Sequence, residues 1–130
     1  MAKPIKLHLI LEKQDEKLWG RVEIKDNLVI DSASNIPALE KKIRKALLDF
    51  EGIREVEFEY RYDLTVFFEQ FSFLNQSKIA ELAGINPGLI RQYSSGHKQP
   101  SREQVDKIEK AIREMAGKLR TVKLSAKAPA

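Results

Sequence analysis

The side chains with the clearest chemistry lie close together in residues 86–92. Arg91 carries a planar fork of donors that fits guanine O6 and N7, and Gln92 can pair with adenine N6 and N7. Each such pairing is worth ~1–3 kcal/mol of discrimination between bases. Base reading of this kind needs a helix that enters the major groove, so the neighbouring residues must be able to build one. The simpler alternative for Arg91 is a solvated surface charge.

Residues 76–93 carry the pattern of two short helices joined by a tight turn. Ala80 is small enough for the two helices to cross closely, and Gly84 can take the left-handed backbone of the turn. Asn86 can cap the second helix, and Pro87 suits its first position, where a missing N–H costs nothing. These features together predict a helix-turn-helix whose second helix starts at Pro87.

Two sets of residues are predicted to contact DNA. Outward positions at the start of the second helix would face the bases, namely Asn86, Pro87, Gly88, Arg91 and Gln92. The start of the first helix and the loop after the second would contact phosphates through Gln76, Ser77, Ser95, His97 and Lys98. The alternative that His97 is an ordinary loop residue is as favoured as a phosphate contact, whereas for Lys98 the phosphate contact is the favoured interpretation. Tyr93 shares a face with Ile90 and is expected in the core.

Residues 63–124 predict an all-helical domain around this pair. Asp63 can cap a helix with a broad apolar face made of Leu64, Phe67, Phe68, Phe71 and Leu74, which we expect to be core. Another amphipathic helix is predicted over 102–118, with Val105, Ile108, Ile112 and Met115 inward. The change from strand to helix patterns places the domain boundary between residues 62 and 63. Residues 125–130 are expected to form a disordered tail.

This half of the chain resembles the lambda-repressor-like (Cro/repressor, XRE-type) helix-turn-helix family. Gln76 opens the first helix as in that family, Ala80 and Gly84 follow at the family's spacing, and Gly96 and Pro100 precede another apolar-periodic helix. The resemblance covers residues 64–118. It implies that the second helix of the pair enters the major groove while the first crosses the DNA backbone.

The first half, residues 1–62, predicts a β-β-β-α-β domain. Alternating apolar residues predict strands over 5–11, 18–24, 28–30 and 56–62. Asn35 and Pro37 can start an amphipathic helix that Gly52 ends. The inward face of that helix is expected to contain Ile36, Leu39, Ile43, Ala46, Leu47 and Phe50.

This order of elements resembles HicB-type antitoxins, whose N-terminal part is a degenerate RNase H-like fold. No sequence motif in residues 5–62 is diagnostic of that family. The expected fold class is therefore α+β, with a HicB-like front half followed by a lambda-repressor-like helical domain. The resemblance implies that a toxin protein is a possible partner.

Composition narrows the classes of function. The chain has 130 residues, 42% hydrophobic and 32% charged, as in folded proteins. It contains 0 cysteines, which excludes disulfides and zinc-finger spacings. Residues 1–63 hold 12 Lys and Arg against 13 Asp and Glu, whereas residues 64–130 hold 11 against 6, so the excess positive charge lies in the second half. A positive half favours an anionic partner such as nucleic acid.

These observations favour a sequence-specific regulator that binds double-stranded DNA, acts as a repressor and recognises a pseudo-palindromic operator as a homodimer. We expect no catalytic residues, metal or cofactor, and a cytoplasmic location, since no signal peptide or membrane span is apparent. One alternative is a protein-interaction module that neutralises a toxin without specific DNA binding. An RNase H-like nuclease is disfavoured, because it needs gathered carboxylates, one of them on the first strand, and residues 5–11 have none.

Overall fold

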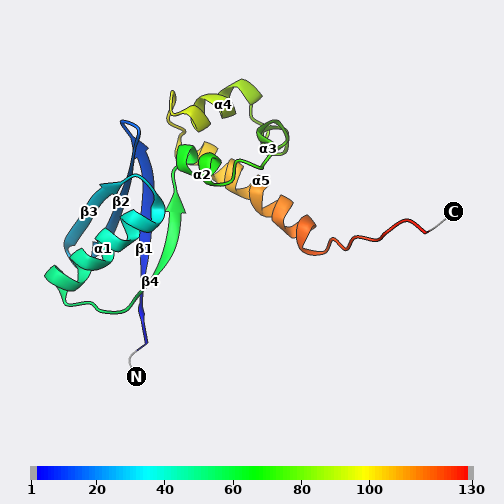
Figure 1. Ribbon diagram of the computed structural model, residues 1–130. Coiled ribbons are helices and arrows are strands. Elements are labelled where there is room, and N and C mark those ends of the chain that lie inside the picture. The colour runs from blue at the N-terminus through cyan, green and yellow to red at the C-terminus, as the bar shows by residue number, and fades with distance from the viewer. Residues whose placement is uncertain (1–2, 129–130) are drawn as a thin grey trace. The chain divides into compact units, whose positions relative to one another are not determined.

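A computed structural model describes residues 3–128 and shows a mixed α+β protein (Figure 1). The described residues form one 4-stranded sheet and the helices α1 to α5. The chain divides between Ser72 and Phe73 into two compact units. The first unit is built around the sheet and the second is helical, in the order that the sequence predicts. None of the helices in the described part of the chain has the length and apolar character needed to cross a membrane.

The first unit contains β1 (Ile5–Gln14), β2 (Lys17–Ile24), β3 (Asn27–Ala33), α1 (Ile36–Glu51), β4 (Val56–Tyr62) and α2 (Leu64–Gln70). Its sheet has the order β3-β2-β1-β4. β1 and β2 form an antiparallel hairpin, as do β2 and β3, whereas β4 lies parallel to β1. The β1–β2 turn is made by Asp15 and Glu16, both with positive φ (52° and 62°), which gives the backbone twist that a tight hairpin needs.

Helix α1 covers one face of the sheet and closes the core (Figure 1). The core residues alternate along the strands and recur along the helix, namely Leu9, Leu11, Leu18, Val22, Ile24, Leu39, Ile43, Leu47, Val56 and Val66. Gly20 lies where the helix comes nearest, because a Cβ placed there would stand 2.8 Å from Cδ2 of Leu39. The predicted caps of α1 are confirmed: Asn35 Oδ1 accepts a hydrogen bond from the Ala38 N–H at 2.8 Å, and Gly52 ends the helix at φ 68°.

Three expectations for this unit were wrong: the lengths of two strands and the burial of Phe50. β1 continues to Gln14 and β3 covers Asn27–Ala33, because pairing with β2 extends to Gln14 in β1 and over the whole of β3. Phe50 falls in the periodic pattern of α1 but is 81% exposed. The residues of α1 with no exposure, such as Leu47, end one turn earlier, so the last turn of the helix extends beyond the core.

Helix α2 belongs with the sheet, so the two units divide ten residues later in the chain than the predicted boundary between residues 62 and 63. Asp63 caps α2 as predicted, through a 2.8 Å hydrogen bond from the Val66 N–H. Its other carboxylate oxygen accepts from the Lys13 N–H at 2.9 Å, and its own N–H donates to Leu11 O at 2.9 Å. These bonds join the start of α2 to β1, fifty residues away in sequence.

The second unit contains α3 (Gln76–Ala83), α4 (Pro87–Ser95) and α5 (Arg102–Arg120). Ile79, Ala80, Ile90, Tyr93, Ile108 and Ala111 are its most buried side chains on these helices. α5 is longer than predicted by two residues and begins at a Ser101 cap. Residues 122–128 form neither helix nor strand, and residues 129–130 of the predicted tail lie outside the described part of the chain.

Candidate nucleic-acid interface

Helices α3 and α4 are joined by residues 84–86, the tight turn that the sequence predicts. Gly84 adopts φ 70°, and Ala80 is fully buried where the chain turns back. The Ile85 N–H donates to Ala80 O at 2.9 Å, which fixes the turn to the end of α3. Both residues therefore have the structural role expected of them.

The start of α4 is defined by Asn86 and Pro87, as predicted. Asn86 Oδ1 accepts a 2.7 Å hydrogen bond from the Gly88 N–H, and Pro87 occupies the first turn. On the inner side of α4, Ile90 is 0% and Tyr93 4% exposed, which confirms that Tyr93 is a core residue. The orientation of α4 is thus set by burial on one side and by its cap at one end.

Of the five predicted base-contacting residues, Asn86 caps α4 and the other four lie on its first two turns. Asn86, Pro87, Arg91 and Gln92 are exposed and Gly88 is half-buried. Arg91 reaches back toward the helix start, since its Nη2 lies 3.8 Å from where a Cβ on Gly88 would be. The guanidinium group therefore lies beside the helix N-terminus, at van der Waals distance from a Cβ at position 88.

The predicted phosphate-contacting residues fall into two groups. Ser77 is exposed at the start of α3, but Gln76 is half-buried and its Oε1 accepts a hydrogen bond from Ser94 Oγ at 3.1 Å. Gln76 therefore links α3 to the end of α4. Its side-chain carbonyl is engaged in this link, which leaves its amide group for other contacts.

The loop after α4 brings the other three phosphate candidates together. Ser95 Oγ and His97 Nδ1 lie 2.7 Å apart, and the Lys98 N–H donates to Gln92 O at 3.2 Å. These contacts fold the loop back on the last turn of α4, where Gly96 has φ 82°. Ser95, His97 and Lys98 are all exposed on this loop.

The charges in this part of the second unit differ in their pairing. On α5, Arg102, Lys107 and Arg113 each form an ion pair one turn away, with Asp106, Glu103 and Glu109 respectively. Among the residues that the structure describes, none forms an ion pair with Arg91 or Lys98. Both side chains are exposed, so their positive charge is available to an anionic ligand.

Two useful residues escaped the sequence reasoning. Asn75 caps α3, because its Oδ1 accepts from the Lys78 N–H at 3.1 Å. The standard signal, an Asn directly before an apolar-periodic run, was present. Ser94, the partner of Gln76, had no such signal because the two residues meet only when the helices cross.

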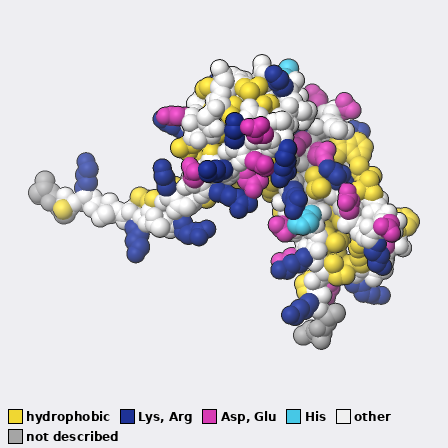
Figure 2. Space-filling model, turned by 180° about the vertical axis from the view of Figure 1, so that it is seen from behind, with side chains coloured by type: hydrophobic (Ala, Val, Ile, Leu, Met, Phe, Trp, Pro, Cys, Tyr) yellow, Lys and Arg dark blue, Asp and Glu magenta, His cyan; other side chains and the backbone are white. Residues whose placement is uncertain are grey.

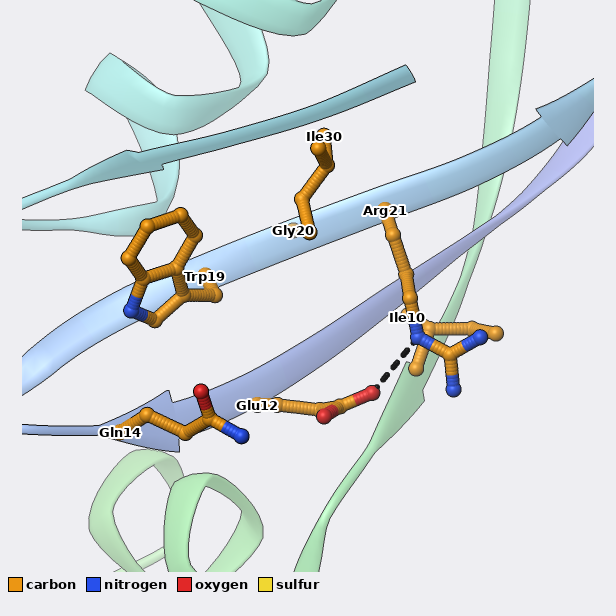
Figure 3. Close-up of a pocket in the computed structure, with 7 residues that line it drawn as sticks. All are labelled: Ile10, Glu12, Gln14, Trp19, Gly20, Arg21 and Ile30. Carbon is orange, nitrogen blue, oxygen red and sulfur yellow. Dashed lines mark hydrogen bonds and ion pairs between the residues drawn. The ribbon is translucent and has the colours of Figure 1, made fainter. Parts of the chain in front are cut away.

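A small cavity of about 150 Å³ lies on the opposite face of the sheet from α1 (Figure 3). Glu12 and Arg21 line it and form a 2.7 Å ion pair, and Trp19 Nε1 is buried without a hydrogen-bond partner among the described residues. Because β1 extends beyond residue 11, the first strand does carry a carboxylate, that of Glu12, contrary to the sequence reasoning. Within residues 3–128, no three His, Cys, Asp or Glu side chains are grouped to hold a metal ion.

The fold and the site thus define an α+β protein with a sheet-based unit and a helical unit that exposes an arginine and a glutamine at a helix start. Comparison with protein-family models, with curated proteins and with solved structures found no match to this chain.

Proposed function

We propose that the protein is a sequence-specific transcriptional regulator that binds double-stranded DNA through α3 and α4. In this proposal the two helices form a helix-turn-helix of the lambda-repressor-like type, with α4 in the major groove. The observation that carries it is the start of α4, where Arg91 and Gln92 are exposed beside Gly88 while Ile90 and Tyr93 hold the other side in the core.

The chemistry of base reading follows from these positions. Arg91 offers two donors to guanine O6 and N7, and Gln92 offers one donor and one acceptor to adenine N7 and N6. No ion pair has to be broken for Arg91 to reach a base, since none of the described residues forms one with it. Ser77 at the start of α3 and Lys98 after α4 would hold the phosphates on either side.

A regulator of this type acts as a homodimer that sets two recognition helices about one DNA turn apart, roughly 34 Å. The two-fold symmetry of such a dimer calls for a pseudo-palindromic operator. Occupying a promoter in the cytoplasm would then repress transcription.

A second candidate function is the neutralisation of a toxin protein by the first unit, which the likeness to HicB-type antitoxins suggests. The observation in its favour is the face of the sheet not covered by α1, where Leu28 and Ile30 are 56% and 54% exposed. Figure 2 shows hydrophobic side chains exposed among charged ones on the unit built around the sheet. Co-purification with the product of a neighbouring gene, lost on changing Ile30 to Asp, tests this role.

The DNA-binding proposal is tested by selecting bound duplexes from a random pool with the full chain. We expect an enriched motif with two symmetric half-sites. Arg91→Ala should relax the preference at one position of each half-site, by about tenfold or more, because a bidentate contact is lost. The matched control is Arg113→Ala, which removes an exposed arginine from α5 and should leave the motif intact. Recovery of a pool with no enriched motif would overturn the proposal.

A further inference from the structure

Strand β4 leaves one edge of the sheet without a partner strand among the described residues. β1 is the only strand hydrogen-bonded to β4, and the 3.1 Å bond from the Ile5 N–H to Glu55 O shows which backbone groups of β4 face β1. On the other edge, the Val56 carbonyl accepts a hydrogen bond from Arg44 Nη1 of α1 at 2.6 Å. Successive residues of a strand direct their N–H and C=O groups to opposite sides. Since Glu55 faces β1, Phe58 and Tyr60 direct their N–H and C=O groups away from the sheet. Such an edge is a template for one more strand.

The side chains along β4 divide cleanly between two faces. Phe58 and Tyr60 lie on the face that α1 covers, since they pair with Leu7 and Leu9 of β1. Glu57 and Glu59 lie on the opposite face and are exposed, and Glu55 just before the strand is exposed as well. A strand added at this edge would therefore meet apolar side chains on one face and carboxylates on the other.

Residues 122–128, which we call the C-terminal segment, have the complementary pattern. They follow the end of α5 and form neither helix nor strand. Val122 and Leu124 are 54% and 93% exposed. They alternate with Lys123, and the next lysine is Lys127, so the segment has one apolar and one basic face when extended.

We propose that the C-terminal segment of a second copy of this chain adds to β4 as an antiparallel fifth strand. When Leu124 is placed opposite Phe58, Val122 falls opposite Tyr60. The same register sets Lys123 opposite Glu59 and Lys127 opposite Glu55, because the two lysines and the two glutamates are each four residues apart. Apolar and charged pairs are thus satisfied in a single register.

The pairing occurs between copies, in a reciprocal exchange. Among the residues described, the C-terminal segment forms no strand, and β1 is the only strand paired with β4. When each of two copies gives its segment to the other, both edges are covered in one closed, two-fold symmetric contact. Two added strands also bury the exposed Val122 and Leu124 of both chains.

Amide hydrogen exchange of the full chain, followed residue by residue by NMR, tests this pairing directly. The amides of Phe58 and Tyr60 should exchange at least tenfold more slowly in the intact protein than in Leu124→Asp, which places a carboxylate against the apolar face of the added strand. The amides of Glu57 and Glu59 face β1 and should be equally slow in both proteins. Phe50→Asp, at another highly exposed apolar side chain, is the matched control and should change nothing.

Dilution separates pairing between copies from pairing within one chain. The protection of Phe58 and Tyr60 should disappear together with the dimer mass in light scattering as the protein is diluted. Protection that persists in the monomer, or equal exchange rates in the intact protein and Leu124→Asp, would overturn the proposal.

Charge reversal tests the register. Lys123→Glu and Glu59→Lys should each weaken the dimer several-fold, and the double variant should restore it, since opposite charges then face each other again. A double variant as weak as the sum of the two would contradict the register. No DNA is present in these experiments, so their outcome is independent of the DNA-binding proposal.

Discussion

The guanidinium group of Arg91 lies beside the bare backbone of Gly88, with Nη2 3.8 Å from where a Cβ would stand. The same Cβ would be 3.1 Å from Asn86 Oδ1, the oxygen that caps α4. A methyl group at position 88 would thus crowd the cap oxygen, while its contact with the arginine would be at ordinary van der Waals distance. This relationship makes Gly88 a test of how α4 presents Arg91.

We predict that Gly88→Ala lowers DNA affinity about tenfold while changing the free energy of unfolding by no more than about 1 kcal/mol, because alanine favours the helix as much as the contact disfavours it. Affinity for the selected duplex and urea unfolding measure the two effects. Gly117→Ala makes the same chemical change on α5, where nothing lies within 4 Å of the new Cβ, and should keep the affinity. Equal affinities for the two variants would contradict this role of Gly88.

Lys98→Ala is predicted to weaken binding to all duplexes alike. Its ammonium group contacts phosphate in our proposal, and removing one such contact reduces the slope of log affinity against log salt by about 1. Binding titrations of the selected and a scrambled duplex between low and moderate salt give both slopes. Arg91→Ala serves as the contrasting variant, because it should affect the selected duplex more than the scrambled one. Identical behaviour of the two variants would refute the division between base and phosphate contacts.

Gly20→Ala is predicted to destabilise the first unit by about 1–3 kcal/mol, the usual cost of overpacking. The new Cβ would stand 2.8 Å from Leu39 Cδ2 and 3.2 Å from Leu9 Cδ1, and because both leucines are fully buried, their movement would disturb the core around them. Urea unfolding followed by Trp19 fluorescence reports on this unit. Gly117→Ala is again the control and should not destabilise the protein. An unfolding midpoint for Gly20→Ala equal to that of the native chain would show that α1 does not approach β2 so closely.

The pair Tyr60 and Glu40 should make stability depend on pH at both extremes. The hydrogen bond from the Tyr60 hydroxyl to Glu40, helped by burial, raises the pKa of Tyr60 from 10.0 to about 12. The folded protein therefore keeps a proton that the unfolded chain loses, so stability falls as pH rises from about 10 to about 12. Burial acts to raise the pKa of Glu40, but hydrogen bonds from Tyr60 and Arg44 outweigh it and lower the pKa below 4.5. The stability that Glu40 contributes through these bonds is fully present above pH 4.5 and is lost as pH falls through its lowered pKa.

Tyr60→Phe is the variant that tests this pair. It should abolish the tyrosine titration near pH 12 seen by ultraviolet absorbance, and it should raise the pKa of Glu40 measured by carbon-13 NMR. Tyr62→Phe is the control and should keep the Tyr60 titration and the lowered pKa of Glu40. A Glu40 pKa that is the same with and without the Tyr60 hydroxyl would show that the hydrogen bond does not form in solution.

The elements of the second unit were predictable because their signals are local. Gly84, Asn86 and Pro87 act within about one helical turn: Gly84 has the left-handed backbone expected of it, Asn86 caps α4 and Pro87 lies in the first turn of α4. Periodicity was a weaker guide, since Leu82 shares the apolar pattern of α3 but is 44% exposed. A pattern shows which residues share a helix face, but not how much of that face another element covers.

The boundary between the units could not be predicted for a related reason. Residues 64–70 have a helical pattern, which placed them with the other helices. Hydrogen bonds of Asp63 with Lys13 and Leu11 instead join α2 to the sheet, and the ring of Tyr62 packs edge-on against Phe71 at 5.9 Å. Contacts between residues about fifty positions apart cannot be recognised from the local pattern of residue types.

The sequence by itself determined where α4 begins and which side of it is buried, because a cap, a proline and apolar spacing act along the chain. Only the tertiary structure decided that Gln76 is bound to Ser94 and that Arg91 and Lys98 have no ion-pair partner among the described residues. These properties depend on which side chains packing brings together. The candidate residues 86–92 were therefore identified from spacing, while the lack of an ion-pair partner for Arg91 among the described residues emerged from the fold.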